Sequence, residues 1–476
     1  MKFYKIIFFA AMAMSTLAGC KKNLEIEPEQ SVSDDAVFTT KNGAQSALNG
    51  VYSTAQLLNV FGSQPQTMGD FQADNVEFVG SFPTLQEIFQ FTTISTNVTV
   101  QGWWQDHYRV ILRANSIIDR VPGITESGFT DVQKKQMVAE AKFMRALTYF
   151  QLVNLFGQPV QINGGNSLGV PLILKEFIGE VEFPARATVS AVHLQIKKDL
   201  EEAIPDLLVN FSVASDTRGR ATKGAARGLL SRLHLYRNEW TEAASYANDV
   251  ITATPLYALA SNYAFFDGNT AEDIFSIQMT AIDNSRTGAG GWASSHRPAA
   301  NGGRGDCPFS LSLEEAYAQE PGDLRFLISS MGNAADGISR RFTLKFPDAI
   351  NNIDNAPIIR VTEMYLNRAE ALAEKDGINQ TSIDLMNALR TRAGLPTWTL
   401  STFTTKEDLV AAILNERRKE LCFEGHRRMD LLRKGLPLRS SGPTAGISKP
   451  GDDKVILPIP QRELDINRSL QKNPGY

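Results

Sequence analysis

Apolar residues repeat at helical spacing in two similar blocks, and this repetition restricts the fold more than any other feature of the sequence. In the first block, residues 223–254, one apolar stripe is followed by a polar turn at 237–239 and then by a second stripe. The stripes are made of Leu229, Leu233, Tyr236 and Trp240, and of Ala243, Ala247, Val250 and Ile251. A spacing of three and four residues places each stripe on one face of an α-helix. The block therefore predicts two antiparallel helices joined by a short turn.

The second block, residues 360–394, repeats this plan on both sides of Gly377. Its stripes are made of Val361, Tyr365, Ala369 and Leu372, and of Ile383, Met386 and Leu389. Helical pairs with small residues at the contact resemble tetratricopeptide units, which stack on one another to bury a common core. The two blocks are degenerate, so the number of units stays open.

The remaining chain alternates between helical patterns and irregular segments. Helices are expected from near Thr40 and over residues 103–118, 131–154 and 188–207. Residues 62–99 lack periodicity, and residues 256–357 are glycine-rich, with short strand candidates such as 274–279 and 343–346. We predict a mostly α-helical protein, with a tetratricopeptide-like helical-hairpin scaffold and a large loop-rich insertion that holds few strands.

The N-terminus has the pattern of a lipoprotein signal peptide. Lys2 and Lys5 precede the apolar run 6–18, which is too short to span a bilayer comfortably. The run ends in Leu17-Ala18-Gly19-Cys20, which resembles a bacterial lipobox. In that resemblance the signal peptide, residues 1–19, is removed and Cys20 carries the lipid. An ordinary signal peptide with an incidental cysteine is the weaker alternative.

The net charge argues against a nucleic-acid partner, and the cysteine content argues against a disulfide. The net charge of the 476 residues is −4, so there is no basic surplus to attract nucleic acid. The other two cysteines, Cys307 and Cys422, lie far apart in the sequence, and we expect no disulfide.

The segment 413–435 concentrates charge on a helix that also carries an apolar face. A buried carboxylate is costly unless it is paired and hydrogen-bonded, so this pattern predicts a structural ion-pair hub. Its members are Glu416, Arg417, Glu420, Glu424 and Arg427. Four arginines of the same segment, Arg417, Arg418, Arg427 and Arg428, are expected to neutralise the carboxylates.

Enzymatic alternatives find little support in the sequence. His426 and Asp430 superficially resemble a kinase catalytic loop, but the chain has no glycine-rich phosphate loop and no Val-Ala-Ile-Lys strand. The five histidines have no metal-ligand spacing. A glycosidase needs two carboxylates at a defined separation, which 52 acidic residues do not specify. We expect no enzyme activity, no cofactor and no metal.

Several stretches together resemble the SusD/RagB family of Bacteroidetes outer-membrane lipoproteins. They are Asn415 to Leu421 (NERRKEL), Phe423 to Arg427 (FEGHR), Leu457 to Pro460 (LPIP), Asn473 to Tyr476 (NPGY), Tyr365 to Ala371 (YLNRAEA), Arg113 to Asn115 (RAN) and Arg145 to Phe150 (RALTYF). Cys422 departs from the small apolar residue that is more usual there, and it fits the same buried position. With the lipobox, the resemblance covers essentially the whole chain.

The resemblance implies a lipid-anchored protein at the cell surface that captures nutrient for a SusC-like TonB-dependent outer-membrane transporter. Residues 20–33 would form the tether and 34–476 the SusD-like domain, with helical parts at about 34–255 and 358–476 around the insertion at about 256–357. The ligand would be an oligosaccharide, or a peptide as in the RagB branch. A tetratricopeptide scaffold that binds only protein, and a surface glycosidase, are the other functions left open.

Two loops combine aromatic with polar side chains, as sugar recognition requires. They supply Asp70, Asp74, Asn75, Phe78 and Phe82, and Trp292, His296, Arg297 and Asn301. Trp292 is the strongest candidate because no helical stripe accounts for it, and its alternative role is to anchor the loop on the core. Asp70 and Asp74 have an alternative role as caps of local turns. Arg304-Gly305-Asp306 matches an adhesion tripeptide, a match that is common by chance.

Overall fold

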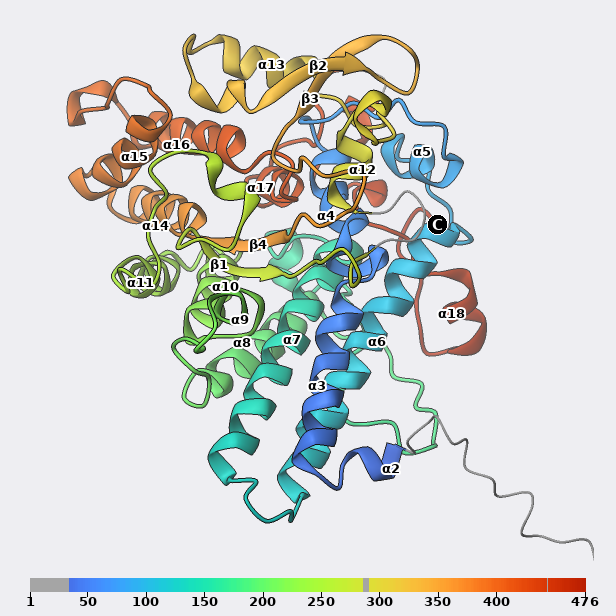
Figure 1. The fold of residues 1–476 in the computed structure, drawn as a ribbon. Coiled ribbons are helices and arrows are strands. Elements are labelled where there is room, and N and C mark those ends of the chain that lie inside the picture. Colours follow the sequence, from blue (N-terminus) through green and yellow to red (C-terminus); the bar gives the residue numbers. More distant parts are fainter. Residues whose placement is uncertain (1–33, 286–290, 443) are drawn as a thin grey trace, which may run out of the picture.

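Long helices packed side by side make up most of the protein, as the sequence predicts. The structure is a computed structural model that describes residues 34–285, 291–442 and 444–476. In chain order the long helices are α3 (Lys41–Ala55), α6 (Val98–Arg120), α7 (Asp131–Phe156), α8 (Val189–Ala203), α10 (Lys223–Tyr236), α11 (Trp240–Ile251), α14 (Val361–Asp376), α15 (Gln380–Arg392) and α16 (Lys406–Leu421). Each contacts the next as far as α15, and α16 packs on α14 (Figure 1).

Threonine side chains define where many of these helices begin. Thr40, Thr130, Thr188, Thr222 and Thr405 each accept a hydrogen bond from a backbone N–H in the first turn of the helix that follows. Such caps satisfy donors that have no partner inside the helix. The predicted start near Thr40 is therefore confirmed.

The two helical hairpins predicted from the repeats are present, and they stack on each other. Helices α10 and α11 form the first hairpin, α14 and α15 the second, and α11 packs against α14. The main core lies among the earlier helices, where Leu48, Ile111, Phe143 and Leu229 are fully buried. A second core joins α14, α15 and α16 through side chains that include Leu366, Met386 and Ile413. The mostly α, tetratricopeptide-like fold class is confirmed.

Shorter elements surround this array. The short helices are α2 (Asp34–Val37), α4 (Gln64–Phe71), α5 (Pro83–Phe89), α9 (Ala214–Gly219), α12 (Trp292–His296), α13 (Leu311–Ala318), α17 (Arg427–Arg433) and α18 (Gln461–Ile466). The strands are β1 (Asp273–Ile277), β2 (Ser329–Asn333), β3 (Ser339–Thr343) and β4 (Ala356–Arg360). β1 pairs antiparallel with β4, and β2 with β3. Within the described ranges, no helix combines the length and apolar character needed to cross a bilayer.

The region 62–99 is more ordered than its sequence indicates. It contains α4 and α5, which the lack of periodicity led us to miss. Helices of this length make only about two turns, since one turn takes 3.6 residues, so an apolar stripe cannot repeat often enough to be recognised.

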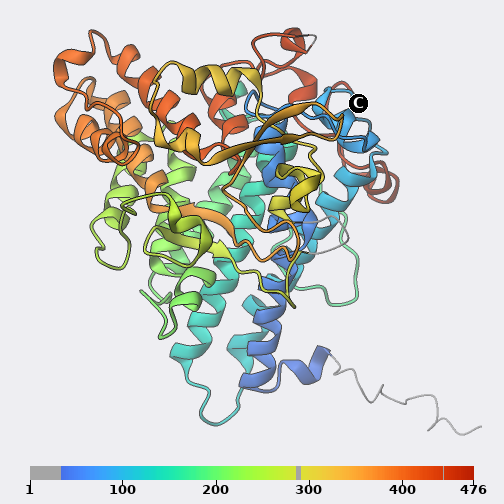
Figure 2. The ribbon, with the colours of Figure 1, turned by 45° about the horizontal axis from the view of Figure 1, so that its top comes forward.

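The middle part of the loop-rich segment lies at one end of the molecule. Helix α13 and the β2–β3 hairpin lie at the end opposite α2, and both views place them there (Figures 1 and 2). Pairing of β1 with β4 brings the two ends of this segment together beside α10.

Candidate functional site

Backbone hydrogen bonds join the two loops that were predicted to bind ligand. The N of Val79 donates to the O of Asp306 at 2.9 Å, and the N of Gly305 donates to the O of Arg297 at 2.8 Å. The segment around Gly305 therefore lies between the two loops and holds them side by side. Residues that are far apart in the sequence form one surface at the loop-rich end.

Phe82 is the aromatic side chain that this surface exposes. Its side chain is 49% exposed, and the guanidinium carbon of Arg304 lies 3.9 Å from the centre of its ring. A guanidinium over a ring face is attracted by the ring quadrupole. Nη2 of Arg304 is also 2.5 Å from a carboxylate oxygen of Asp306, whose pKa is raised by burial against the opposing effect of Arg304. Arg304 thus holds the ring in place.

The β2–β3 hairpin adds a second arginine to the same surface. Nη1 of Arg340 is 3.0 Å from Glu77, and Nη2 is 2.6 Å from Asp336. The N of Ala335 donates to the O of Gly305 at 2.9 Å, which ties the hairpin to the segment that carries Arg304. We call the set formed by the exposed Glu77, Phe82 and Asp336, the half-buried Arg304 and Arg340, and the buried Asp306 the Phe82 shelf. Of these, only Phe82 was predicted as a ligand contact.

Trp292 lies in the protein interior instead of on this surface. It is 2% exposed, its Nε1 donates to the O of Phe61 at 3.0 Å, and its ring packs on Phe346. His296 is fully buried, and burial lowers its pKa to about 4. Neither ring offers a face to a ligand, so this placement matches the anchoring role. The five-residue helix α12 that starts at Trp292 is too short to show a stripe.

The other candidates divide between surface and interior. Asn301 is exposed, whereas Arg297 is 8% exposed. Phe78 is also 8% exposed and packs edge-on against Phe71, with ring centres 4.8 Å apart. Asn301 therefore remains a candidate ligand contact, while Arg297 and Phe78 support the loops from inside.

Asp70, Asp74 and Asn75 bind the loop to the C-terminal charged segment. Oδ2 of Asp70 accepts from the N of Gly425 at 2.8 Å, and Oδ1 accepts from Asn75 at 2.5 Å. Burial raises the pKa of Asp70 to about 6 despite these hydrogen bonds. Burial would also raise the pKa of Asp74. Arg427 opposes this effect through its positive charge and through two hydrogen bonds of 2.6 and 2.8 Å, and the pKa of Asp74 lies below the usual range. These polar groups are occupied by protein partners.

The carboxylates of the predicted hub are buried, but their partners come mainly from elsewhere in the chain. Glu420 contacts Arg360 and Arg392, at 3.2 and 2.8 Å, and Glu424 contacts Lys345 at 2.6 Å. Their pKa values lie below the usual value because these cations outweigh the effect of burial. The pairs link β4, α15 and α16.

The expectation that neighbouring arginines neutralise these carboxylates is therefore wrong. Arg417 pairs with Asp430 at 2.7 Å, and Arg427 pairs with Asp74. Arg418 also reaches the loop around Asp74, and Nη1 of Arg428 donates to the O of Asn154. Side chains close in sequence point to different faces of the helix, which sends these arginines to other parts of the fold.

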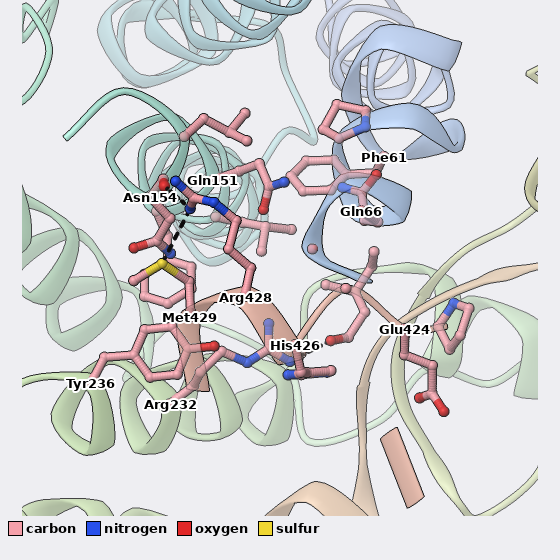
Figure 3. A pocket seen from close by; sticks show the side chains of 18 residues that line it. Phe61, Gln66, Gln151, Asn154, Arg232, Tyr236, Glu424, His426, Arg428 and Met429 are labelled. Carbon is pink, nitrogen blue, oxygen red and sulfur yellow. Dashed lines mark hydrogen bonds between the residues drawn. The ribbon is translucent and has the colours of Figure 1, made fainter. Parts of the chain in front are cut away.

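A small cavity lies beside the hub, between α4, α7, α10 and α17 (Figure 3). Its lining includes Gln66, Arg232, Tyr236, His426 and Arg428. Its volume of about 60 Å³ is far below the roughly 300–1,000 Å³ of small-molecule sites, so it has no room for an oligosaccharide. Both polar atoms of the buried Gln66 side chain lack a partner among the described residues, which fits a site for ordered water.

The remaining sequence predictions concern the three cysteines and a metal site. Cys20 and the signal peptide lie outside the described residues. Cys307 and Cys422 are free and buried. Within the described part of the chain, no group of three His, Cys, Asp or Glu side chains is placed to hold a metal ion.

A tetratricopeptide-like scaffold with an exposed aromatic and polar surface is the architecture of a binding protein, and comparisons with known proteins specify the class. A model described as "SusD family" matches residues 340–476, and one described as "Starch-binding associating with outer membrane" matches residues 22–235. The chain belongs to the SusD/RagB family, which comprises carbohydrate-binding proteins associated with the outer membrane.

Relatives cover nearly the whole chain. SusD-like protein P38 of Formosa agariphila is 26% identical, over 99% of this chain and 98% of its own length. Starch-binding protein SusD of Bacteroides thetaiotaomicron is 24% identical, over 82% of each chain. A SusD superfamily structure from Bacteroides thetaiotaomicron superposes with a TM-score of 0.80 at 26% identity, covering 91% of this chain and 99% of that one. A laminarin-binding SusD-like protein superposes with a TM-score of 0.74 at 26% identity, covering 92% and 100%.

Proposed function

We propose that this protein is a lipoprotein of the cell surface that binds a neutral oligosaccharide on the Phe82 shelf. It delivers this ligand to a SusC-like TonB-dependent transporter and does not cleave it. In this role Cys20 carries the lipid that holds the protein on the outer membrane.

The exposed ring of Phe82 beside Arg304 is the observation that carries the proposal. A flat aromatic face can receive the apolar C–H face of a sugar, while guanidinium and carboxylate groups bind its hydroxyls. Phe82 is half exposed, and the guanidinium of Arg304 lies over its ring. Arg340 and the exposed Glu77 add a donor and an acceptor to the same surface. Family membership and the likeness to a laminarin-binding protein support a glycan as the ligand.

The charges of the shelf favour a neutral ligand over a charged one. Arg304 pairs with Asp306, and Arg340 pairs with Glu77 and Asp336. Because each arginine is already matched by a carboxylate, the shelf presents no strong excess of one sign. A polyanionic glycan would meet no free cation among these residues.

Calorimetry with laminarin oligosaccharides, starch oligosaccharides and a peptide panel tests the proposal. Phe82→Ala should lower the affinity for the bound glycan by about tenfold, equivalent to roughly 1.4 kcal/mol. The matched control is Phe177→Ala, which removes another exposed phenylalanine, 60% exposed, from a distant loop. Equal glycan affinity in the wild type and in Phe82→Ala would overturn the assignment of the shelf.

The same measurements separate the alternative functions. Binding of peptides without binding of glycans would favour a RagB-like peptide carrier. Binding of the transporter with no small ligand would favour a protein-only tetratricopeptide scaffold. Shortened glycans after incubation, seen by chromatography, would favour a glycosidase.

A further inference from the structure

An exposed apolar turn projects from the segment between α7 and α8. Phe177 is 60% exposed and Ile178 is 76% exposed, although both are large apolar side chains. Gly179 follows with a φ of +96°, and a Cβ atom added there would meet no atom within 4 Å. The turn therefore stands clear of the rest of the described protein. We call Phe177 and Ile178 the apolar turn.

The apolar turn lies beside the place where the chain enters the fold. The guanidinium of Arg120 is 4.5 Å from the ring centre of Phe38, just after α2, and its Nε is 3.7 Å from Glu176. The N of Glu176 also donates to Asp119 at 2.8 Å. Both ribbon views show this segment next to α2, at the end opposite the β2–β3 hairpin (Figures 1 and 2).

The proposed lipid anchor places this same end near a bilayer. Residues 20–33 separate the anchoring cysteine from Asp34, where α2 begins. An extended chain spans at most roughly 3.6 Å per residue, so this tether reaches at most about 50 Å. The apolar turn is thus within reach of the surface that holds the lipid.

We propose that the apolar turn inserts into the interfacial region of the lipid bilayer as a second membrane contact. Membrane binding strengthens with the apolar area buried in the interface, so an apolar contact adds to the binding that the lipid at Cys20 supplies. This inference rests on the proposed function, because the anchor at Cys20 brings the turn to the membrane. Glu176, Glu180 and Glu182 flank the turn with Lys175 as the neighbouring cation, so the attraction is apolar and not electrostatic.

Depth-dependent fluorescence quenching of the mature acylated protein in phosphatidylcholine vesicles tests the insertion. Tryptophan placed at the turn by Phe177→Trp should show blue-shifted emission that brominated lipids quench, relative to the wild-type background. Leu311→Trp is the matched control, because Leu311 is also 76% exposed but lies on α13 at the opposite end. Equal quenching of the two variants, or none at position 177, would overturn the proposal.

Transfer between vesicles gives a second measurement. The double variant Phe177→Ser, Ile178→Ser should leave donor vesicles at least about tenfold faster, since burial of each large apolar side chain favours the bound state by about this factor or more. High salt should change this rate little. An unchanged transfer rate would overturn the proposal. If the double variant instead loses co-purification with the transporter and the quenching does not change, the turn is a protein contact and the proposal is also overturned.

Two other measurements show whether the proposed function itself fails. Mass spectrometry of the purified protein shows whether Cys20 is acylated, and calorimetry shows whether glycan binds. The double variant at the turn should bind glycan with wild-type affinity. The segment of the turn lies next to α2, whereas the shelf includes residues of the β2–β3 hairpin at the opposite end of the molecule.

Discussion

Nη1 of Arg390 on α15 donates a 2.7 Å hydrogen bond to Oε1 of Glu416 on α16, and both side chains are at least 96% buried. The other carboxylate oxygen of Glu416 lies 2.8 Å from Arg325, which comes from the loop-rich segment. One glutamate therefore joins two helices and the insertion. Such a pair is costly to break, because removal of one partner leaves a buried charge without compensation.

Glu416→Ala should lower the free energy of unfolding by about 3–5 kcal/mol, as measured by urea denaturation, and leave glycan preference unchanged. The control is Glu202→Ala, which breaks a 2.7 Å pair with Lys142 that is exposed to solvent. That change should cost at most about 1 kcal/mol. A Glu416→Ala protein with full stability and altered ligand selectivity would contradict a structural role for the hub.

Stability should fall steeply in acid. The pKa values of Glu420 and Glu370 lie well below the usual 4.5 because arginine and lysine neighbours outweigh the effect of burial. The unfolded chain binds protons at these groups near pH 4.5 and the folded chain does not, so their contribution is complete above pH 4.5 and is lost as the pH falls below it. Urea denaturation between pH 3 and pH 7 measures this, and Glu420→Gln should reduce the slope below pH 4.5. A wild-type curve that is flat down to pH 3 would contradict it.

Between pH 4 and pH 6.5, buried carboxyl groups and buried histidines act in opposite directions. Burial raises the pKa of Asp70 from 3.8 to about 6, so its contribution to stability is lost as the pH rises through that interval. Burial lowers the pKa of His296 from 6.5 to about 4, so its contribution is lost as the pH falls. Burial also lowers the pKa of His107 to about 4 and that of His193 to about 3, and it raises the pKa of Asp273 to about 6. Because three histidines oppose two carboxyl groups, stability should already begin to fall within this interval as the pH is lowered. The fall should steepen below pH 4.5, where the carboxylates of the hub become protonated.

Trp292→Ala should destabilise the protein without weakening glycan binding by the folded fraction. Loss of a buried tryptophan costs about 3–5 kcal/mol, whereas Trp292→Phe should cost about 1–3 kcal/mol because the O of Phe61 loses its donor. Thermal denaturation measures the first effect and calorimetry the second. A stable Trp292→Ala protein with greatly reduced glycan affinity would restore Trp292 as a ligand contact.

Much of the scaffold could be predicted from the sequence because helices are specified by local contacts. The stripes at 223–254 and 360–394 predicted both hairpins, and Thr40 marked the first long helix, since spacing and capping involve residues only a few positions apart. Helices α4 and α5 escaped detection because they are too short to repeat a stripe. The two ligand loops were recognised by composition alone.

The sequence by itself determined the helical class, the family and the presence of a charged C-terminal hub. Tertiary structure alone decided which side chains meet. It buried Trp292, placed Arg304 over Phe82, and supplied Glu416 with Arg390 and Arg325 in addition to its sequence neighbour Lys419. The physical reason is that helical spacing is set within a few residues, whereas an ion pair or a stacked ring depends on how distant segments pack.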